Sequence, residues 1–389
     1  MKHRPTAGAG WTRRGWTIAS LWLALLAACG GSVGTGGTGS FASGPITGFG
    51  SIIVNGVHYD ESAARIESDD GSGRSRDDLR LGMLVEIDAH AADGNAATAE
   101  RVRIVSELIG RVDAVGPNSL VINGVTARLN GATVFDASFA GGRAGVTPGT
   151  VVEVYGLASG ASGDVVATRI EPRPDAGAFK FGGALSMLDT QARTFRIGSQ
   201  TFVYPAQIAG SEQLANGALL RIAVEPQRDP QRRWIVTSLS GAASVPDEGQ
   251  DVKANGLITQ FTSPANFEVA GRPVDASGAA VRGGPLALGQ RVKLEARARG
   301  GVLVATEVRV VGQDGDDDFE IRGRIVAIDP AARVFELGGK RGRDSYARND
   351  IAYENGAASS LAPGRRVTVT GGLSADGTLI EARRIRFDD

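Results

Sequence analysis

Apolar and polar residues alternate with a period of two along most of the chain after residue 45. Such alternation places apolar side chains on one face of a β-strand and polar side chains on the other. One unit recurs five times, as a glycine followed by apolar residues three and five positions later. The glycines recur at intervals of roughly 70 residues and are Gly82, Gly149, Gly217, Gly289 and Gly364. The chain is therefore predicted to repeat one small β-unit.

Hairpin signals flank each copy of this unit. A second strand follows after a polar turn, as at Asp93–Gly94 and Asp376–Gly377, and Asp-Gly between alternating runs favours a tight hairpin. The third copy departs from this pattern and has Pro226–Pro230 at the turn. Another hairpin precedes each copy, such as 110–115 followed by 120–124. Each unit is thus predicted to contain about five short strands, a size at which small domains fold alone.

These strands predict an all-β chain of about five tandem modules. A small closed barrel is expected because closure removes exposed strand edges, and an OB-like barrel is the favoured topology. A two-sheet sandwich in each module and a solenoid of stacked repeats are the alternatives. The predicted modules span residues 46–106, 107–175, 179–243, 251–313 and 318–389.

The N-terminus has the features of an export signal. Residues 1–28 combine a basic start with a short apolar run, which is typical of a signal peptide and too short for a stable membrane span. The Leu-Ala-Ala-Cys sequence ending at Cys29 resembles the lipobox of bacterial lipoproteins. That resemblance implies lipidation of Cys29 and a membrane anchor. Residues 29–45 are rich in Gly, Ser and Thr and are predicted to form a flexible tether.

The same resemblance indicates where the protein resides. No Asp follows Cys29 directly, and in a Gram-negative source this favours the outer membrane, with the modules facing the periplasm or the cell surface. Arg13 and Arg14 faintly resemble a twin-arginine signal, while general secretion is the favoured route.

The repeats resemble a family of uncharacterised domains that occur in tandem in proteobacterial lipoproteins. The second module carries the resemblance best. Its matching segments are Ile122–Gly124, Thr133–Phe135, Pro148–Gly149, Val152–Gly156 and Ala167–Ile170. The third and fourth modules match more loosely. These motifs are turn glycines and core positions, so the resemblance implies a fold and no activity.

Composition and net charge argue against one class of function, general nucleic-acid binding. The 389 residues include 55 Gly and carry a net charge of −1, so the chain as a whole has no general attraction for nucleic acid. A basic cluster in the last module is the exception and could bind an anionic polymer such as lipopolysaccharide or nucleic acid. Its members are Lys340, Arg341, Arg343, Arg365, Arg366, Arg383, Arg384 and Arg386. Solvated strand positions are the favoured interpretation of this cluster.

Candidate chemistry is sparse. No nucleophile, phosphate-binding or zinc pattern is present, so no catalytic residue, cofactor or enzyme activity is predicted. His58 and His90 are expected at or near the surface. Asp314, Asp316 and Asp318 are weak candidates for a hard cation and are interpreted as a solvated linker. Paired carboxylates are left open, because their chemistry depends on a spatial separation that sequence does not contain.

Aromatic residues are expected in cores rather than on a binding platform. Phe135, Tyr155 and Trp234 fall at core-like strand positions. We therefore expect a non-enzymatic, lipid-anchored envelope protein with a binding or structural role, and envelope protein or glycan as partner. Polyanion binding through the last module and an unrecognised envelope hydrolase are the alternatives. Neither the ligand nor the oligomeric state is predicted.

Overall fold

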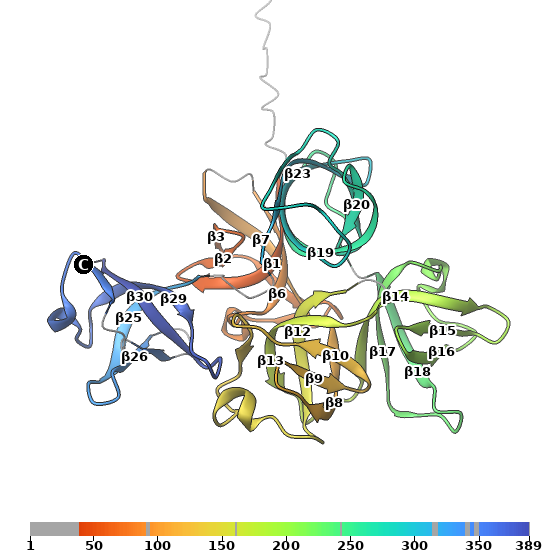
Figure 1. Ribbon diagram of the computed structural model, residues 1–389, viewed down its shortest axis with the longest axis horizontal. Coiled ribbons are helices and arrows are strands. Elements are labelled where there is room, and N and C mark those ends of the chain that lie inside the picture. Colours follow the sequence, from red (N-terminus) through yellow and green to blue (C-terminus); the bar gives the residue numbers. More distant parts are fainter. Residues whose placement is uncertain are drawn as a thin grey trace, which may run out of the picture. The chain divides into compact units, whose positions relative to one another are not determined.

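The computed structural model describes residues 39–90, 94–159, 162–241, 243–312, 318–338, 343–345 and 350–388. Cys29 and the predicted signal peptide lie outside the described residues. The described chain folds into five β-barrels, which Figure 1 colours in sequence order from orange to blue. None of its helices is long and apolar enough to cross a membrane.

Barrels 1 and 2 are built from the first thirteen strands. Barrel 1 comprises β1 (Ser40–Phe49), β2 (Ile52–Val54), β3 (Val57–Asp60), β4 (Arg65–Ser68), β5 (Gly73–Arg74), the 3-10 turn η1 (Arg76–Asp78), β6 (Leu84–Ala89) and β7 (Ala96–Val105). Barrel 2 comprises β8 (Leu108–Val115), β9 (Ser119–Ile122), β10 (Val125–Arg128), β11 (Val134–Phe135), η2 (Gly142–Gly145), β12 (Val151–Ala158) and β13 (Val165–Pro172).

The remaining strands form three further barrels. Barrel 3 comprises β14 (Phe179–Asp189), β15 (Thr194–Ile197), β16 (Gln200–Val203), η3 (Ser211–Gln213), β17 (Leu219–Arg228) and β18 (Trp234–Gly241). Barrel 4 comprises β19 (Asp251–Ser263), β20 (Asn266–Val269), β21 (Arg272–Asp275), β22 (Ala280–Arg282), β23 (Arg291–Arg299) and β24 (Val302–Val310). Barrel 5 comprises β25 (Phe319–Asp329), β26 (Val334–Leu337), β27 (Arg343–Ser345), β28 (Ala352–Glu354), η4 (Ala358–Ser360), β29 (Arg366–Leu373) and β30 (Leu379–Phe387).

All five barrels close in the same strand order. In barrel 2, β8 pairs with β9 and β9 with β10 as antiparallel hairpins, and β10 then pairs in parallel with β13. β12 lies between β13 and β8 and completes the ring with antiparallel pairs. Barrel 3 repeats this order with β14, β15, β16, β18 and β17. The predicted OB-like barrels are confirmed, and the sandwich and solenoid alternatives do not apply.

The turn between the second and third strands explains a recurring sequence pair. Asn55 and Gly56 have φ values of 54° and 79°, and Asn123 and Gly124 have 49° and 77°. Two successive left-handed residues are what a two-residue hairpin of this kind requires, and Asn and Gly adopt that conformation at the lowest cost. The turn residues therefore set the register of the hairpin locally.

First strands also join one barrel to another. β1 of barrel 1 pairs in parallel with β19 of barrel 4 along Ser40–Ser43 and with β25 of barrel 5 at Gly48 and Phe49. β8 of barrel 2 pairs with β14 of barrel 3. Buried clusters cross the same boundaries, because one apolar core contains residues of barrels 2 and 3 and another contains residues of barrels 1 and 5.

The start of barrel 1 corrects one sequence expectation. Residues 40–45 belong to the predicted tether, yet they form the first half of β1 and are buried. β1 pairs with β6 of its own barrel on one side and, along Ser40–Ser43, with β19 of barrel 4 on the other, so its start lies at the junction of the two barrels. At Gly44 a Cβ would lie 2.8 Å from the side-chain Oδ1 of Asn55, so close packing rather than flexibility accounts for the glycine here.

Candidate functional site

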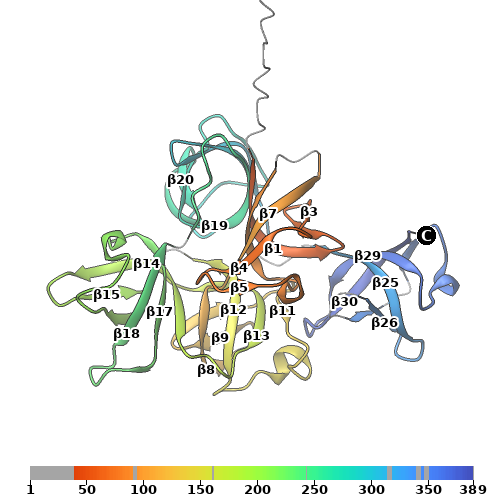
Figure 2. The ribbon, with the colours of Figure 1, turned by 180° about the vertical axis from the view of Figure 1, so that it is seen from behind.

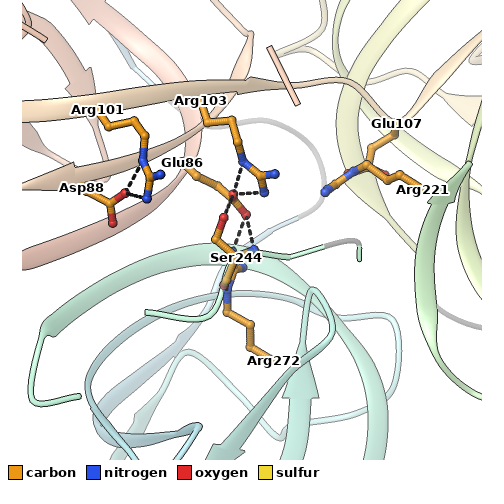
Figure 3. A network of polar contacts seen from close by, with 8 residues as sticks. All are labelled: Glu86, Asp88, Arg101, Arg103, Glu107, Arg221, Ser244 and Arg272. Carbon is orange, nitrogen blue, oxygen red and sulfur yellow. Dashed lines mark hydrogen bonds and ion pairs between the residues drawn. The ribbon is translucent and has the colours of Figure 1, made fainter. Parts of the chain in front are cut away.

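A buried carboxylate lies where barrels 1 and 4 meet. Glu86 on β6 is 5% exposed and faces away from the core of its own barrel. Arg103, its cross-strand neighbour on β7, donates from Nε at 2.9 Å, and the buried guanidinium of Arg272 on β21 donates to the other carboxylate oxygen. Ser244 adds its hydroxyl at 2.6 Å (Figure 3). Residues from barrels 1 and 4 and from the segment between barrels 3 and 4 thus converge on one charge.

Arg272 is held on several sides. It is 4% exposed, donates from Nε to the carbonyl oxygen of Ser244 at 2.9 Å, and lies 5.1 Å from the ring centre of Phe41 on β1. Burial lowers the pKa of Arg272, while Glu86 acts to raise it. A guanidinium stays protonated in proteins, so a permanent positive charge is buried between the barrels.

The electrostatics of Glu86 follow from these neighbours. Burial by itself raises the pKa of a carboxyl group. Arg272, Arg103 and Arg221 outweigh that effect, with help from the Ser244 hydroxyl, and lower the pKa of Glu86 to about 2. Glu86 is therefore ionised throughout the physiological range. Asp88 and Arg101 extend the same ladder outward, two positions along each strand (Figure 3).

A second buried pair connects the start of barrel 2 to barrel 3. Glu107 is 2% exposed and accepts a hydrogen bond at 3.2 Å from Nε of Arg221 on β17. Lys180 of β14 lies nearby in the fold and donates from Nζ to Asp69 at 2.7 Å and to Ser106 at 2.8 Å. Buried ions are tolerated only when paired and hydrogen-bonded, so these contacts hold barrels 1, 2 and 3 together.

A polar cavity of about 270 Å³ lies between barrels 1 and 2. β4 and β5 contribute lining residues from barrel 1, and β12 and β13 contribute them from barrel 2. Figure 2 labels these four strands. The polar lining residues that carry charge are Asp69, Arg74, Asp78, Arg80, Asp136, Glu153, Glu171 and Arg173. Met83, Ile104 and the ring of Tyr155 supply the apolar part.

Two carboxylates of this cavity are cross-strand neighbours. Glu153 on β12 is directly opposite Glu171 on β13. Glu171 accepts hydrogen bonds from the Tyr155 hydroxyl at 3.0 Å and from Nε of Arg169 at 2.8 Å. Glu153 is 6% exposed and its nearest cation is Arg173, whose Nη1 is 3.5 Å from Oε2. The carboxylate of Glu171 thus accepts two hydrogen bonds, whereas that of Glu153 has a cation only at 3.5 Å.

The pKa of Glu153 reflects that difference. Burial raises it, Arg173, Lys180 and Ser106 oppose the increase, and Glu171 adds to it. Burial also raises the pKa of Tyr155 well above its usual value, and Glu153 and Glu171 contribute to the increase. Convergent groups with perturbed pKa values in a cavity are typical of binding sites.

Three members of the predicted basic cluster, all on β30, lie beside acids. Arg383 lies 2.5 Å from Asp318, Arg384 lies 3.3 Å from Glu354, and Arg386 lies 3.0 Å from Asp388. Arg365 lies over the ring of Phe387 and Arg366 begins β29. Lys340 and Arg341 lie outside the described residues, as does the side chain of Arg343.

The other predicted positions are placed as follows. Asp314 and Asp316 lie outside the described residues, and no group of three potential metal ligands occurs among those that are described. His90 is exposed beside Glu100 and His58 is half-buried, as expected. Phe135, Tyr155 and Trp234 are all buried, which confirms them as packing residues.

Sequence reasoning missed both the buried ion pairs and the polar cavity. Their residues come from strands on several barrels, so no local cluster marks them. Glu86, Glu153 and Arg272 occupy the outward positions of alternating strands, where polar residues are expected to face solvent. Alternation identifies that face, but it does not tell whether water or another barrel covers it.

Comparison with known proteins matches most of the barrels to one family model. The model, described as a domain of unknown function (DUF5666), matches residues 43–103, 109–171, 255–309 and 311–386. These segments correspond to barrels 1, 2, 4 and 5 and cover more than half of the chain. Barrel 3 has the same strand order and lies outside the matched segments. No curated protein matches the chain.

Proposed function

The chain belongs to the DUF5666 family of domains of unknown function, and from this premise we propose that it is a lipid-anchored protein of the cell envelope with a non-enzymatic binding or structural role. The anchor would be Cys29, through the lipobox that ends the predicted signal peptide. In a Gram-negative source we propose an outer-membrane location, with the barrels facing the periplasm or the cell surface.

One observation carries the structural part of this proposal. Glu86 is buried against Arg103 of its own barrel and Arg272 of another, so the buried charge of Arg272 is neutralised by a carboxylate of a different barrel. Separating the barrels would leave a buried charge without its partner or require it to be resolvated, and both are costly. β1 also pairs with β19 and β25. These contacts support a rigid arrangement of barrels 1, 4 and 5, in which the outer surfaces of the barrels keep fixed positions relative to one another. Such an arrangement suits several weak contacts made at once.

The alternatives have less support. The described arginines of β30 each lie beside a carboxylate, which reduces the field that an anionic polymer would meet. An envelope hydrolase would use the Glu153 and Glu171 pair, but Glu171 is already engaged by Tyr155 and Arg169. Both alternatives are separated from the main proposal by the binding screen described below.

Anchoring is tested by metabolic labelling. The full chain is expressed in a bacterium supplied with an alkyne-bearing fatty acid, beside a Cys29→Ser variant. We expect label and membrane association in the wild type and loss of both in the variant. Equal labelling of the two proteins, or none in either, would contradict the anchor.

The binding role is tested with the purified full chain. It is screened in detergent against envelope glycans, lipopolysaccharide and DNA at low and moderate salt. Glycan binding that is insensitive to salt supports a recognition role. Salt-sensitive binding that is lost in an Arg383→Gln/Arg384→Gln variant would favour the polyanion alternative. Cleavage of a glycan that is lost in Glu153→Gln would favour the hydrolase.

A further inference from the structure

The cavity between barrels 1 and 2 has a property that the ion pairs around it do not explain. Oε2 of Glu153 is buried without a hydrogen-bond partner, although the residue lines a polar hollow of about 270 Å³. Leaving a charged oxygen unsatisfied at such a depth costs more than leaving a neutral one. A structural role alone would be served better by an apolar residue at this position of β12.

The cation nearest to Glu153 is loosely placed. Nη1 of Arg173 lies 3.5 Å from Oε2, within ion-pair range but at the limit of a hydrogen bond. The Arg173 side chain is 41% exposed, so it can leave the cavity without losing a buried environment. Lys180, which also acts on Glu153, is engaged with Asp69 and Ser106. Arg173 thus occupies the position that a cationic ligand would take.

The partners of the lining carboxylates single out Glu153 as the acceptor for a ligand. Five carboxylates and three guanidiniums line the cavity. Lys180 and Arg169 also pair with Asp69, Asp136 and Glu171, whereas Glu153 has its ion pair with Arg173 at 3.5 Å. The carboxylates are Asp69, Asp78, Asp136, Glu153 and Glu171. Tyr155, Met83 and Ile104 add an apolar surface that suits a short alkyl chain.

We propose that this cavity binds the ammonium or guanidinium group of a small organic cation, with Glu153 as the accepting carboxylate and Arg173 as the side chain that the ligand displaces. The volume suits a ligand of a few carbon atoms, since sites for drug-sized molecules begin at about 300 Å³. The inference goes beyond the proposed function, because it requires neither the lipid anchor nor a macromolecular partner.

Calorimetric titration of the full chain in detergent tests the site. The probes are 1,5-diaminopentane and agmatine, with 1,5-pentanediol as a neutral analogue and glutarate as an anionic one. We expect the two cations to bind and the two controls not to bind. Failure of both cations to bind, or equal binding of the diol, would overturn the proposal.

Two variants assign the binding to this cavity. Glu153→Gln keeps the shape of the side chain and is expected to weaken cation binding at least tenfold. Arg173→Met removes the internal competitor and is expected to tighten binding several-fold, which a merely structural arginine would not do. Glu295→Gln, on the exposed pair with Lys253, is the matched control and should leave binding unchanged. Should Glu153→Gln fail to fold by circular dichroism, Arg173→Met decides the question, and unchanged or weaker binding there would refute the site.

Discussion

The guanidinium of Arg272 on β21 donates a hydrogen bond to the carboxylate of Glu86 on β6, although the two residues are 186 positions apart in the sequence. Each belongs to a different barrel, and each is almost completely buried. The stability of barrel 1 is therefore coupled to that of barrel 4 through one charge pair.

Glu86→Gln should destabilise the protein by about 3–5 kcal/mol, because it leaves Arg272 as a buried charge without a counterion. The measurement is the free energy of unfolding from a urea titration followed by circular dichroism. Glu295→Gln breaks the exposed Lys253–Glu295 pair and should cost no more than about 1 kcal/mol. Similar decreases in the free energy of unfolding for the two variants would show that the buried pair contributes no more to stability than the exposed one.

The same carboxylate predicts a loss of stability in acid. The pKa of Glu86 falls from an ordinary value of 4.5 in the unfolded chain to about 2 in the folded protein. Its contribution, about 3 kcal/mol, is present above pH 4.5 and is lost as the pH falls through about 2. Unfolding titrations at pH 7, 4 and 2.5 should therefore show the gap between wild type and Glu86→Gln closing as the solution becomes acidic. A gap independent of pH would be inconsistent with ionised Glu86 as its cause.

Glu153 predicts a change of the opposite sign. Burial raises its pKa in the folded state, so the folded protein holds this proton more tightly than the unfolded chain does. The associated stability is present below the unfolded pKa and is lost as the pH rises through the folded pKa. Glu153→Gln should therefore be at least as stable as the wild type at pH 8, and its advantage should shrink toward pH 4. A variant that is much less stable at pH 8 would disprove this assignment.

Gly82 should tolerate substitution less well than the equivalent glycine of barrel 4. Its φ is +77°, and a Cβ there would lie 2.3 Å from the carbonyl oxygen of Thr168 in barrel 2, whose hydroxyl donates to the Gly82 carbonyl at 2.6 Å. Gly289 has a φ of +79° and open space around the same point. Gly289→Ala should cost about 1–2 kcal/mol from backbone strain, and Gly82→Ala clearly more. Hydrogen exchange should show the additional loosening at residues 81–83 and 167–170, and equal effects of the two substitutions would argue against close contact at this junction.

The barrels themselves followed from local information. Alternation in strands such as 152–154 and 367–369, with glycine or Asn-Gly at the turns, determines which side chains enter a core and where the chain reverses. These signals act over a few residues, because the side-chain period of a strand and the left-handed turn are properties of the local backbone. The sequence by itself was therefore sufficient to predict a tandem array of small all-β modules.

Only the tertiary structure decided what covers the outer faces of those modules. Residues 40–45 were predicted to belong to a tether, yet they form the buried first half of a strand that pairs with its own barrel and with barrel 4. Three charged residues occupy strand positions at which alternation predicts a solvated side chain, yet segments distant in the sequence bury them. They are Glu86, Glu153 and Arg272. The sequence around a charged residue does not tell whether water will solvate it or an opposite charge will neutralise it. That depends on which segments the folded chain brings within a few ångströms.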